Sequence, residues 1–254
     1  MNLSVLGADD GGESLLKYTW SAVGTPPAPV TFSANSTNAA KNVIATFGAS
    51  GTYTLRATIS DGSLNTSSDV TVTVSQTLTS ITVTPATVTI NTGTTKQFAA
   101  TAKDQFGNAL VSQPAFVWSV SSGGGSISSA GLFTAPATAG TSVVRAASGA
   151  ISGTATVTIV VPVPAAPTTL KLTASSRTQI NLSWLDKSSN ESGFLIERSL
   201  DGINFTQVAM LGPKIQAWSA TGLVANTRYY FRVRAWNSGG NSAWSSIASV
   251  KTKP

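Results

Sequence analysis

The sequence predicts an all-β protein of three tandem β-sandwich domains, and three observations support this prediction. Short runs alternate strictly between apolar and hydroxyl residues, as in residues 70–74 and 155–159. A tryptophan beside a serine stands in a β-rich run three times, at residues 20–21, 118–119 and 183–184. Thr, Ser, Ala, Val and Gly dominate a chain in which only 10% of residues are charged. Alternation of period two is typical of half-buried antiparallel strands, so we expect two-layered sheets around a core of inward-facing side chains.

The first two domains look like diverged copies of one unit. Gly51-Thr52 leads, five residues later, to Arg56-Ala57, and Gly140-Thr141 leads at the same spacing to Arg145-Ala146. Each copy then closes on one of the alternating runs. The sequence therefore indicates an internal repeat with a period of about 90 residues.

Two short segments separate the predicted domains. Residues 161–167 alternate proline with small residues, which favours an extended, semi-rigid spacer. The first junction, residues 75–78, is shorter and has no glycine, so we expect limited bending there. We predict domains at residues 1–76, 77–161 and 162–254.

Composition argues against catalysis. The chain has no Cys and no His, so disulfides, thiolate metal sites and the commonest proton shuttle are absent. The ten acidic residues fall mostly in Asp-Gly turns or on alternating strands, where no pair stands out. We predict no enzymatic activity and no cofactor. The first residues lack the basic start and apolar stretch of a secretory signal, so we expect the chain to begin inside a larger protein.

The net charge of +6 is concentrated in the last domain. Residues 1–75 carry three basic and five acidic side chains, residues 76–161 three and one, and residues 162–254 ten and four. No long Lys/Arg run, nucleic-acid motif or membrane-length apolar run accompanies this excess. We interpret it as a solvated surface and predict neither nucleic-acid binding nor membrane insertion.

The last domain resembles a fibronectin type III domain of the kind appended to secreted bacterial enzymes and surface proteins. Pro167, residues 180–184, residues 194–199 and residues 223–235 carry the resemblance. Leu223, six residues before Tyr229, matches the tyrosine corner of that family, in which a phenol hydroxyl ties a crossover to the backbone. There is no Arg-Gly-Asp sequence, so integrin-type adhesion finds no support.

The middle domain resembles the bacterial immunoglobulin-like domains of group 2. The matching residues are 80–85, 93–94, 97–102, 118–119 and 131–135, which run the length of the domain. The resemblance implies a small immunoglobulin-like sandwich that serves outside the cell as a spacer or adhesive module.

The first domain is similar to polycystic-kidney-disease-type and related immunoglobulin-like domains. Asp9-Asp10-Gly11, Tyr18-Thr19-Trp20, residues 51–55 and residues 59–62 carry the similarity. The strand that these domains place ahead of the position of Leu3 is missing. We therefore expect an N-terminally truncated domain with one unpaired sheet edge that is prone to edge-strand association.

Four carboxylates of the first domain are weak calcium candidates. Asp9, Asp10, Asp61 and Asp69 fall in loops or at strand ends, and calcium prefers clustered oxygen ligands. Their spacing matches no known calcium loop, and turns capped by Asp account for the same residues. We predict no metal site.

The aromatic residues give the sharpest binding hypothesis. Trp20, Trp118 and Trp184 lie on predicted core strands and are best explained by packing. If Tyr229 points inward, alternation places its neighbours at every second position on the outward face of the same strand. Such a face could stack on sugar rings or simply cover the sheet, and we favour covering. The candidate ligand-binding residues are Tyr230, Arg232, Arg234, Trp236, Trp218 and Trp244.

Taken together, these features predict a non-catalytic extracellular spacer of a larger secreted or surface-anchored bacterial protein. A polysaccharide-active enzyme is one candidate parent. The alternative is a carbohydrate-binding module that uses the aromatic and arginine face of the last domain. The expected partners are the rest of the parent protein and, under the alternative, a polysaccharide.

Overall fold

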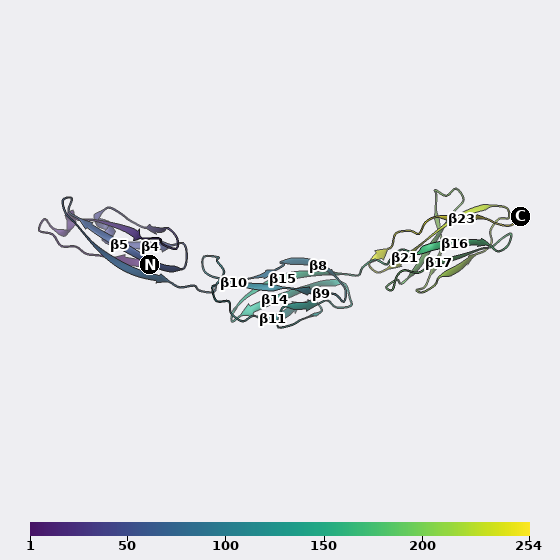
Figure 1. Cartoon of the computed structure of the whole chain (residues 1–254), viewed down its shortest axis with the longest axis horizontal. Helices are drawn as coiled ribbons and strands as arrows, with labels where there is room; N and C mark the ends of the chain where they lie inside the picture. Colours follow the sequence, from purple (N-terminus) through teal and green to yellow (C-terminus); the bar gives the residue numbers. More distant parts are fainter.

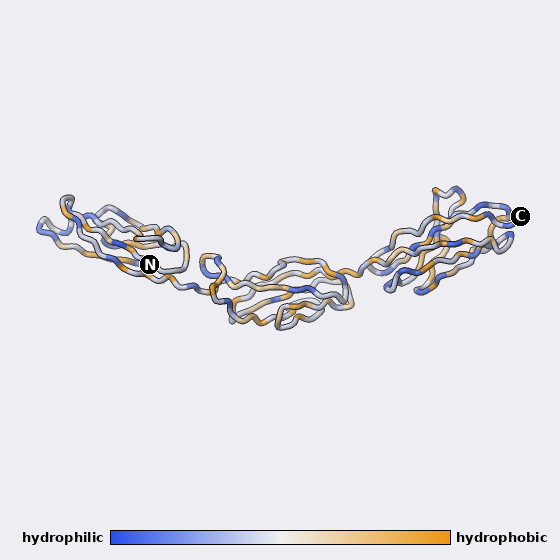
Figure 2. Tube along the Cα trace, viewed as in Figure 1, coloured by the Kyte–Doolittle hydropathy of each residue, from blue (hydrophilic) through white to orange (hydrophobic).

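The computed structural model describes residues 1–254 as three β-sandwiches joined end to end in an elongated row (Figure 1). Two short 3-10 turns, η1 (Glu13–Leu15) and η2 (Asn38–Lys41), are the only helical elements. Each sandwich has its own cluster of 11 buried apolar residues. Figure 2 shows apolar and polar residues interspersed along the strands. The predicted all-β, three-sandwich fold is confirmed, and no helix is long and apolar enough to cross a membrane.

The first sandwich packs two three-stranded sheets face to face. Buried residues alternate along residues 51–60, where Tyr53, Leu55 and Ala57 face the core. Trp20 packs among them, as predicted. One sheet has the order β1 (Asn2–Ser4), β4 (Asn42–Phe47), β3 (Val30–Phe32), and the other β2 (Lys17–Val23), β5 (Gly51–Ser60), β6 (Asn65–Val74).

The second sandwich closes its seam with a strand that crosses between the sheets. β7 (Ser80–Thr84) pairs with β10 (Ala99–Lys103) of one sheet, and the chain then turns at Pro85 into β8 (Thr87–Asn91), which pairs with β15 (Ile151–Val160) of the other. β8 and β15 are parallel, whereas all other ladders are antiparallel. The antiparallel pairing expected for residues 155–159 is present with β14, and their other neighbour β8 runs parallel because the crossing strand keeps its direction when it changes sheets. The remaining strands are β9 (Thr95–Gln97), β11 (Val117–Ser122), β12 (Ser126–Ile127), β13 (Leu132–Thr134) and β14 (Gly140–Ser148).

The repeat seen in the sequence occupies the same register in both domains. Gly51 pairs with Val74 across β5 and β6, and Gly140 pairs with Ile159 across β14 and β15. The two Arg-Ala motifs lie at equivalent places in these ladders, with Arg56 opposite Asp69 and Arg145 opposite Thr154. The long hairpins of the two domains are therefore structural equivalents.

The third sandwich has a three-stranded and a five-stranded sheet. Its tyrosine corner is formed as predicted, since the Val224 N–H donates to the Tyr229 hydroxyl at 2.9 Å. The first sheet has the order β16 (Thr168–Ala174), β17 (Ile180–Leu185), β20 (Ala217–Ala220). The second has the order β19 (Thr206–Leu211), β18 (Gly193–Ser199), β21 (Arg228–Asn237), β22 (Gly240–Asn241), with β23 (Ala248–Lys251) also on β21.

Candidate functional site: the arginine and aromatic face and the domain junctions

The predicted outward row on β21 is present. Burial alternates along the strand, with Tyr229, Phe231, Val233 and Ala235 inside. The intervening side chains are partly exposed on the other face of the sheet. These are Tyr230, Arg232, Arg234 and Trp236.

Arginine side chains occupy stacking positions on this face. The guanidinium carbon of Arg232 lies 4.3 Å from the centre of the Phe205 ring and 4.4 Å from that of Trp244, and Arg234 lies 4.3 Å from the same indole. Arg232 also donates to Glu197 directly across the ladder, at 2.6 and 2.8 Å. Cations over aromatic rings attract through the ring quadrupole, so this ladder stabilises the sheet surface. A sugar ring would have to displace arginine to stack on Trp244.

The other two aromatic residues of the row cover glycines. A Cβ at Gly193 would lie 2.9 Å from the Trp236 Nε1, and a Cβ at Gly202 would lie 3.2 Å from the Tyr230 ring. The indole N–H of Trp236 and the Nε of Arg234 are buried without a hydrogen-bond partner. These aromatic rings therefore pack close against the backbone.

Trp218 does not join the face with which it was grouped. It lies on β20 of the opposite sheet, across from Leu182, and packs against the third core. The predicted six-residue set thus separates into four residues of β21 with Trp244 packed against them, and Trp218 on the other sheet. Its distance along the chain from β21 gave no signal of which sheet it would join.

The four calcium candidates do not form a cluster. Asp69 pairs with Arg56 at 2.7 and 2.8 Å, and Asp10 is exposed. Asp61 accepts the backbone N–H groups of residues 63 and 64, and these bonds lower its pKa. Asp9 accepts the N–H of residue 11 and lines a hollow together with Asp61. The turn and ion-pair contacts account for Asp9, Asp61 and Asp69, and no group of three acidic residues lies close enough to hold a metal ion.

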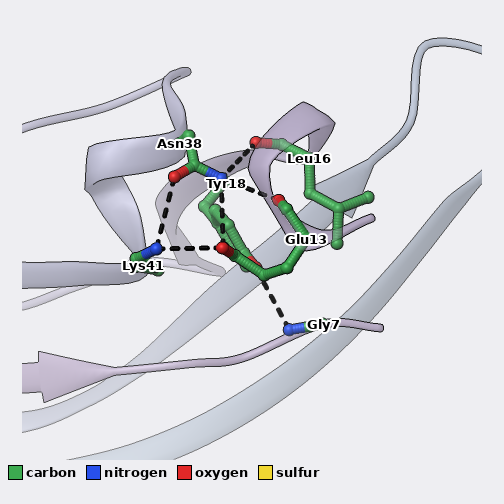
Figure 3. A network of polar contacts seen from close by, with 6 residues as sticks. All are labelled: Gly7, Glu13, Leu16, Tyr18, Asn38 and Lys41. Atoms are coloured by element: carbon green, nitrogen blue, oxygen red, sulfur yellow. Dashed lines mark hydrogen bonds and ion pairs between the residues drawn. The ribbon is translucent and has the colours of Figure 1, made fainter. Parts of the chain in front are cut away.

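A polar network that the sequence did not indicate joins η1, η2 and the start of β2 in the first domain (Figure 3). The Glu13 carboxylate accepts hydrogen bonds from Tyr18, Asn38 and Lys41, at 3.0 Å for the tyrosine hydroxyl. The Tyr18 hydroxyl in turn accepts the N–H of Gly7. The bonds from Lys41 and Tyr18 lower the pKa of Glu13. The network fastens the loop around η1 to η2 and is explained by loop anchoring.

The first junction is tied to the second domain by two glutamine side chains. Gln105 donates to the Ser75 carbonyl and accepts from the Thr77 N–H, both at 2.8 Å. Gln76 accepts the Val111 N–H at 2.9 Å. The chain that leaves β6 at Val74 is therefore anchored from its next residue onward.

A buried carboxylate lies at the centre of this junction. Asp104 is only 1% exposed and accepts the N–H groups of Phe106 and Asn108. Its other oxygen accepts Gln76 at 3.2 Å and Ser50 of the first domain at 3.4 Å. Burial raises the pKa of Asp104, but the backbone and side-chain donors outweigh burial and leave the pKa below its ordinary value of 3.8.

The second junction is tied to the third domain by two asparagine side chains. The Pro162 carbonyl accepts Nδ2 of Asn190 at 2.8 Å and Nδ2 of Asn237 at 2.9 Å. The backbone at Gly239 approaches so closely that a Cβ there would lie 2.0 Å from the Val161 oxygen. The start of the proline-rich segment, at Val161 and Pro162, is therefore docked on the third domain.

Comparison with known families covers the last third of the chain. Residues 165–251 match the family model "Fibronectin type III domain", which confirms the resemblance drawn from the sequence for this domain. No curated protein matches the chain. The resemblances of the first two domains to polycystic-kidney-disease-type and group 2 immunoglobulin-like domains stay predictions.

Solved structures similar to the chain include tandem and single modules. A crystal structure of titin domains A168-A170 is 18% identical to this chain, with a TM-score of 0.38. The match covers 96% of this chain and 90% of the titin chain. A Fn3-like protein from Clostridium thermocellum is 27% identical over 36% of this chain and 95% of that one, with a TM-score of 0.32. A titin kinase with its flanking domains is 27% identical, with a TM-score of 0.33. The match covers 36% of this chain but spans only 17% of that longer one.

Proposed function

We propose that this chain is a non-catalytic spacer that holds neighbouring parts of a larger protein at a fixed separation. The observation that carries the proposal is the docking of both junctions by side-chain amides. At the first junction Ser75 and Thr77 are bound by Gln105, and at the second Pro162 is bound by Asn190 and Asn237. Only Val161 stands between the last residue of β15 and the tethered Pro162. Such junctions limit bending far more than a free linker does.

Docked junctions suit a spacer because no strand or 3-10 turn of one domain packs extensively against an element of the next. Interfaces within a chain usually need several hundred Å² of surface to fix two domains, and without one relative motion is the default. Here each net hydrogen bond contributes on the order of 1 kcal/mol, so several together hold a segment that has few conformations to lose. Rigidity therefore comes from the linkers.

We further propose a bacterial, extracellular setting, which rests on the resemblance of residues 77–161 and 162–254 to modules of secreted bacterial proteins. In this setting the chain would separate a catalytic or adhesive part from its anchor. Fractionation of the source cells with an antibody against this chain tests the location. Recovery from the cytoplasm alone would contradict it.

Distance measurement between adjacent domains tests the spacer function directly. The chain has no cysteine, so spin labels can be placed at Ser21→Cys with Ser152→Cys for the first junction, and at Ser152→Cys with Lys251→Cys for the second. We expect a narrow distance distribution at both junctions. Broad distributions in the unmodified junctions would refute the proposal.

Matched variants locate the source of rigidity. Gln76→Ala with Gln105→Ala should broaden only the first distribution, and Asn190→Ala with Asn237→Ala only the second. Gln207→Ala removes an exposed amide that makes no side-chain hydrogen bond and serves as the control.

Polysaccharide binding is the second candidate function, supported by the gathering of Tyr230, Arg232, Arg234, Trp236 and Trp244 on one face. It has less support than the spacer because arginine already lies against Trp244. Retention on insoluble cellulose, chitin, xylan or starch tests it. Retention that Trp236→Ala abolishes, with thermal stability unchanged, would establish it. No retention would exclude it for those polymers.

A further inference from the structure

The outer face of the five-stranded sheet in the third domain carries far more positive than negative charge. Alternation along β21 and the pairing of β21 with β23 place four basic side chains on this side of the sheet. Glu197 is the only acidic residue on the strands of the same sheet. We call this surface the cationic face, and its basic residues are Arg228, Arg232, Arg234 and Lys251.

Most of this charge has no counter-charge within the chain. Arg228 lies directly opposite Lys251 across β21 and β23, and like charges at such positions repel each other. Arg232 pairs with Glu197 at 2.6 Å, whereas the other three basic residues belong to none of the ion pairs of the chain. The sheet therefore keeps three uncompensated cations on one face, which favours an anionic partner.

Stacking holds two of these cations in place. The guanidinium carbons of Arg232 and Arg234 lie 4.4 and 4.3 Å from the centre of the same ring, that of Trp244. The Nε of Arg234 is buried without a hydrogen-bond partner, and no ion pair occupies its terminal nitrogens. A guanidinium presents its N–H groups as a planar fork that matches a carboxylate, and a fork that is already held loses less entropy on binding. Arg234 is therefore preorganised to bind a carboxylate.

The same stacking argues against ligands that need a free aromatic ring. Single-stranded nucleic acids bind largely through base stacking, but arginine already lies over the rings of Phe205 and Trp244. The row from Arg228 to Arg234 is about 20 Å long at a rise of about 3.3 Å per residue. Such a row suits an extended polymer that carries repeated negative charges.

We propose that the cationic face binds an acidic polysaccharide and that the guanidinium of Arg234 holds one of its carboxylates. This inference rests on the second candidate function, polysaccharide binding, and names the class of polymer that the face takes. Charge, and not the stacking of sugar rings, provides the recognition. The spacer function is independent of it, since the docked junctions use none of the four basic residues.

Two polymers that differ only in charge test the proposal. The whole chain is titrated in a calorimeter with polygalacturonate and with the fully methyl-esterified form of the same polymer. We expect saturable binding of polygalacturonate and binding at least about tenfold weaker for the ester, because esterification removes the charge that strengthens the hydrogen bonds to arginine. Added salt should weaken the binding of polygalacturonate. Equal binding of the two polymers would support polysaccharide binding in general but overturn the recognition of charge.

Variants locate the site on the cationic face. Arg234→Gln should weaken the binding of polygalacturonate about tenfold or more, because it removes the cation. Arg234→Lys keeps the charge but loses the planar fork, and should weaken binding about threefold. Arg177→Gln makes the same change at an exposed residue between β16 and β17 and is the matched control. Thermal melting verifies that the variants fold. Equal losses from Arg234→Gln and Arg177→Gln would overturn the proposal, since binding would then follow net charge alone.

Other polyanions supply the remaining outcomes. The same titration is made with single-stranded oligothymidylate and with phosphatidylcholine vesicles that contain phosphatidylserine. Tighter binding of either one than of polygalacturonate overturns the proposal, because the partner is then a nucleic acid or a membrane. An absence of polygalacturonate binding also overturns it. Retention on the neutral polymers with no binding of polygalacturonate would leave the second candidate function standing without this inference.

Discussion

The two junctions are held by hydrogen bonds to different kinds of acceptor. The first is built around a buried carboxylate, Asp104, which accepts donors from its own loop, from the linker and from the first domain. The second is built around a backbone carbonyl, that of Pro162, which accepts two neutral amides. A carboxylate can be protonated, whereas these amides cannot. The rigidity of the first junction should therefore depend on pH, whereas that of the second should not.

The largest effect is expected from Gly239→Ala, which acts on the second junction alone. The added Cβ would lie 2.0 Å from the Val161 backbone oxygen, so the linker or the loop has to move. We expect a loss of about 1–3 kcal/mol from the free energy of unfolding of the third domain and a broader distance distribution between labels at residues 152 and 251. Chemical denaturation and spin-label distances measure the two effects.

Gly212→Ala is the matched control for this substitution. No atom lies within 4 Å of the Cβ position at Gly212. This variant should keep both the stability and the distance distribution of the parent chain. If Gly239→Ala behaves like the control, close approach of the linker does not hold the second junction.

A smaller effect is expected from acid, and it should appear at the first junction. The pKa of Asp104 is lowered in the folded chain, so its contribution is fully present above the ordinary value of 3.8. That contribution is lost as the pH falls through the lowered pKa. Distances between labels at residues 21 and 152 should therefore broaden in this acid range, while those across the second junction stay narrow.

Asp104→Asn should broaden the distances between labels at residues 21 and 152 already at neutral pH. The substitution replaces an accepting oxygen by a donor that faces Gln76. Asp10→Asn changes the same charge at an exposed residue and is the control. Equal broadening of both junctions in acid would mean that general unfolding, and not Asp104, is responsible.

The sequence predicted those features that depend on local periodicity. Alternation along residues 229–235 gave the inward and outward faces of β21, and the spacing of Leu223 and Tyr229 gave the tyrosine corner, because both are set by neighbouring residues. The sheet that Trp218 joins and the docking of Pro162 depend on contacts between distant segments. Asn190 and Asn237 carried no periodic signal, since a turn asparagine that binds its own loop looks the same in sequence as one that binds a linker.

The smallest effect is expected from Gln76→Ala, and it distinguishes the linker from the carboxylate within the first junction. This substitution removes the acceptor of the Val111 N–H and one donor to Asp104 but leaves Gln105 bound to Ser75 and Thr77. A net hydrogen bond of about 0.5–1.5 kcal/mol corresponds to roughly 2- to 12-fold faster exchange of the Val111 amide. The Thr77 amide should change little, and amide exchange followed by NMR reports on both. If hydrogen exchange becomes faster at both the Val111 and the Thr77 amide, the linker docks as one cooperative unit. The two glutamines then do not act as separate tethers.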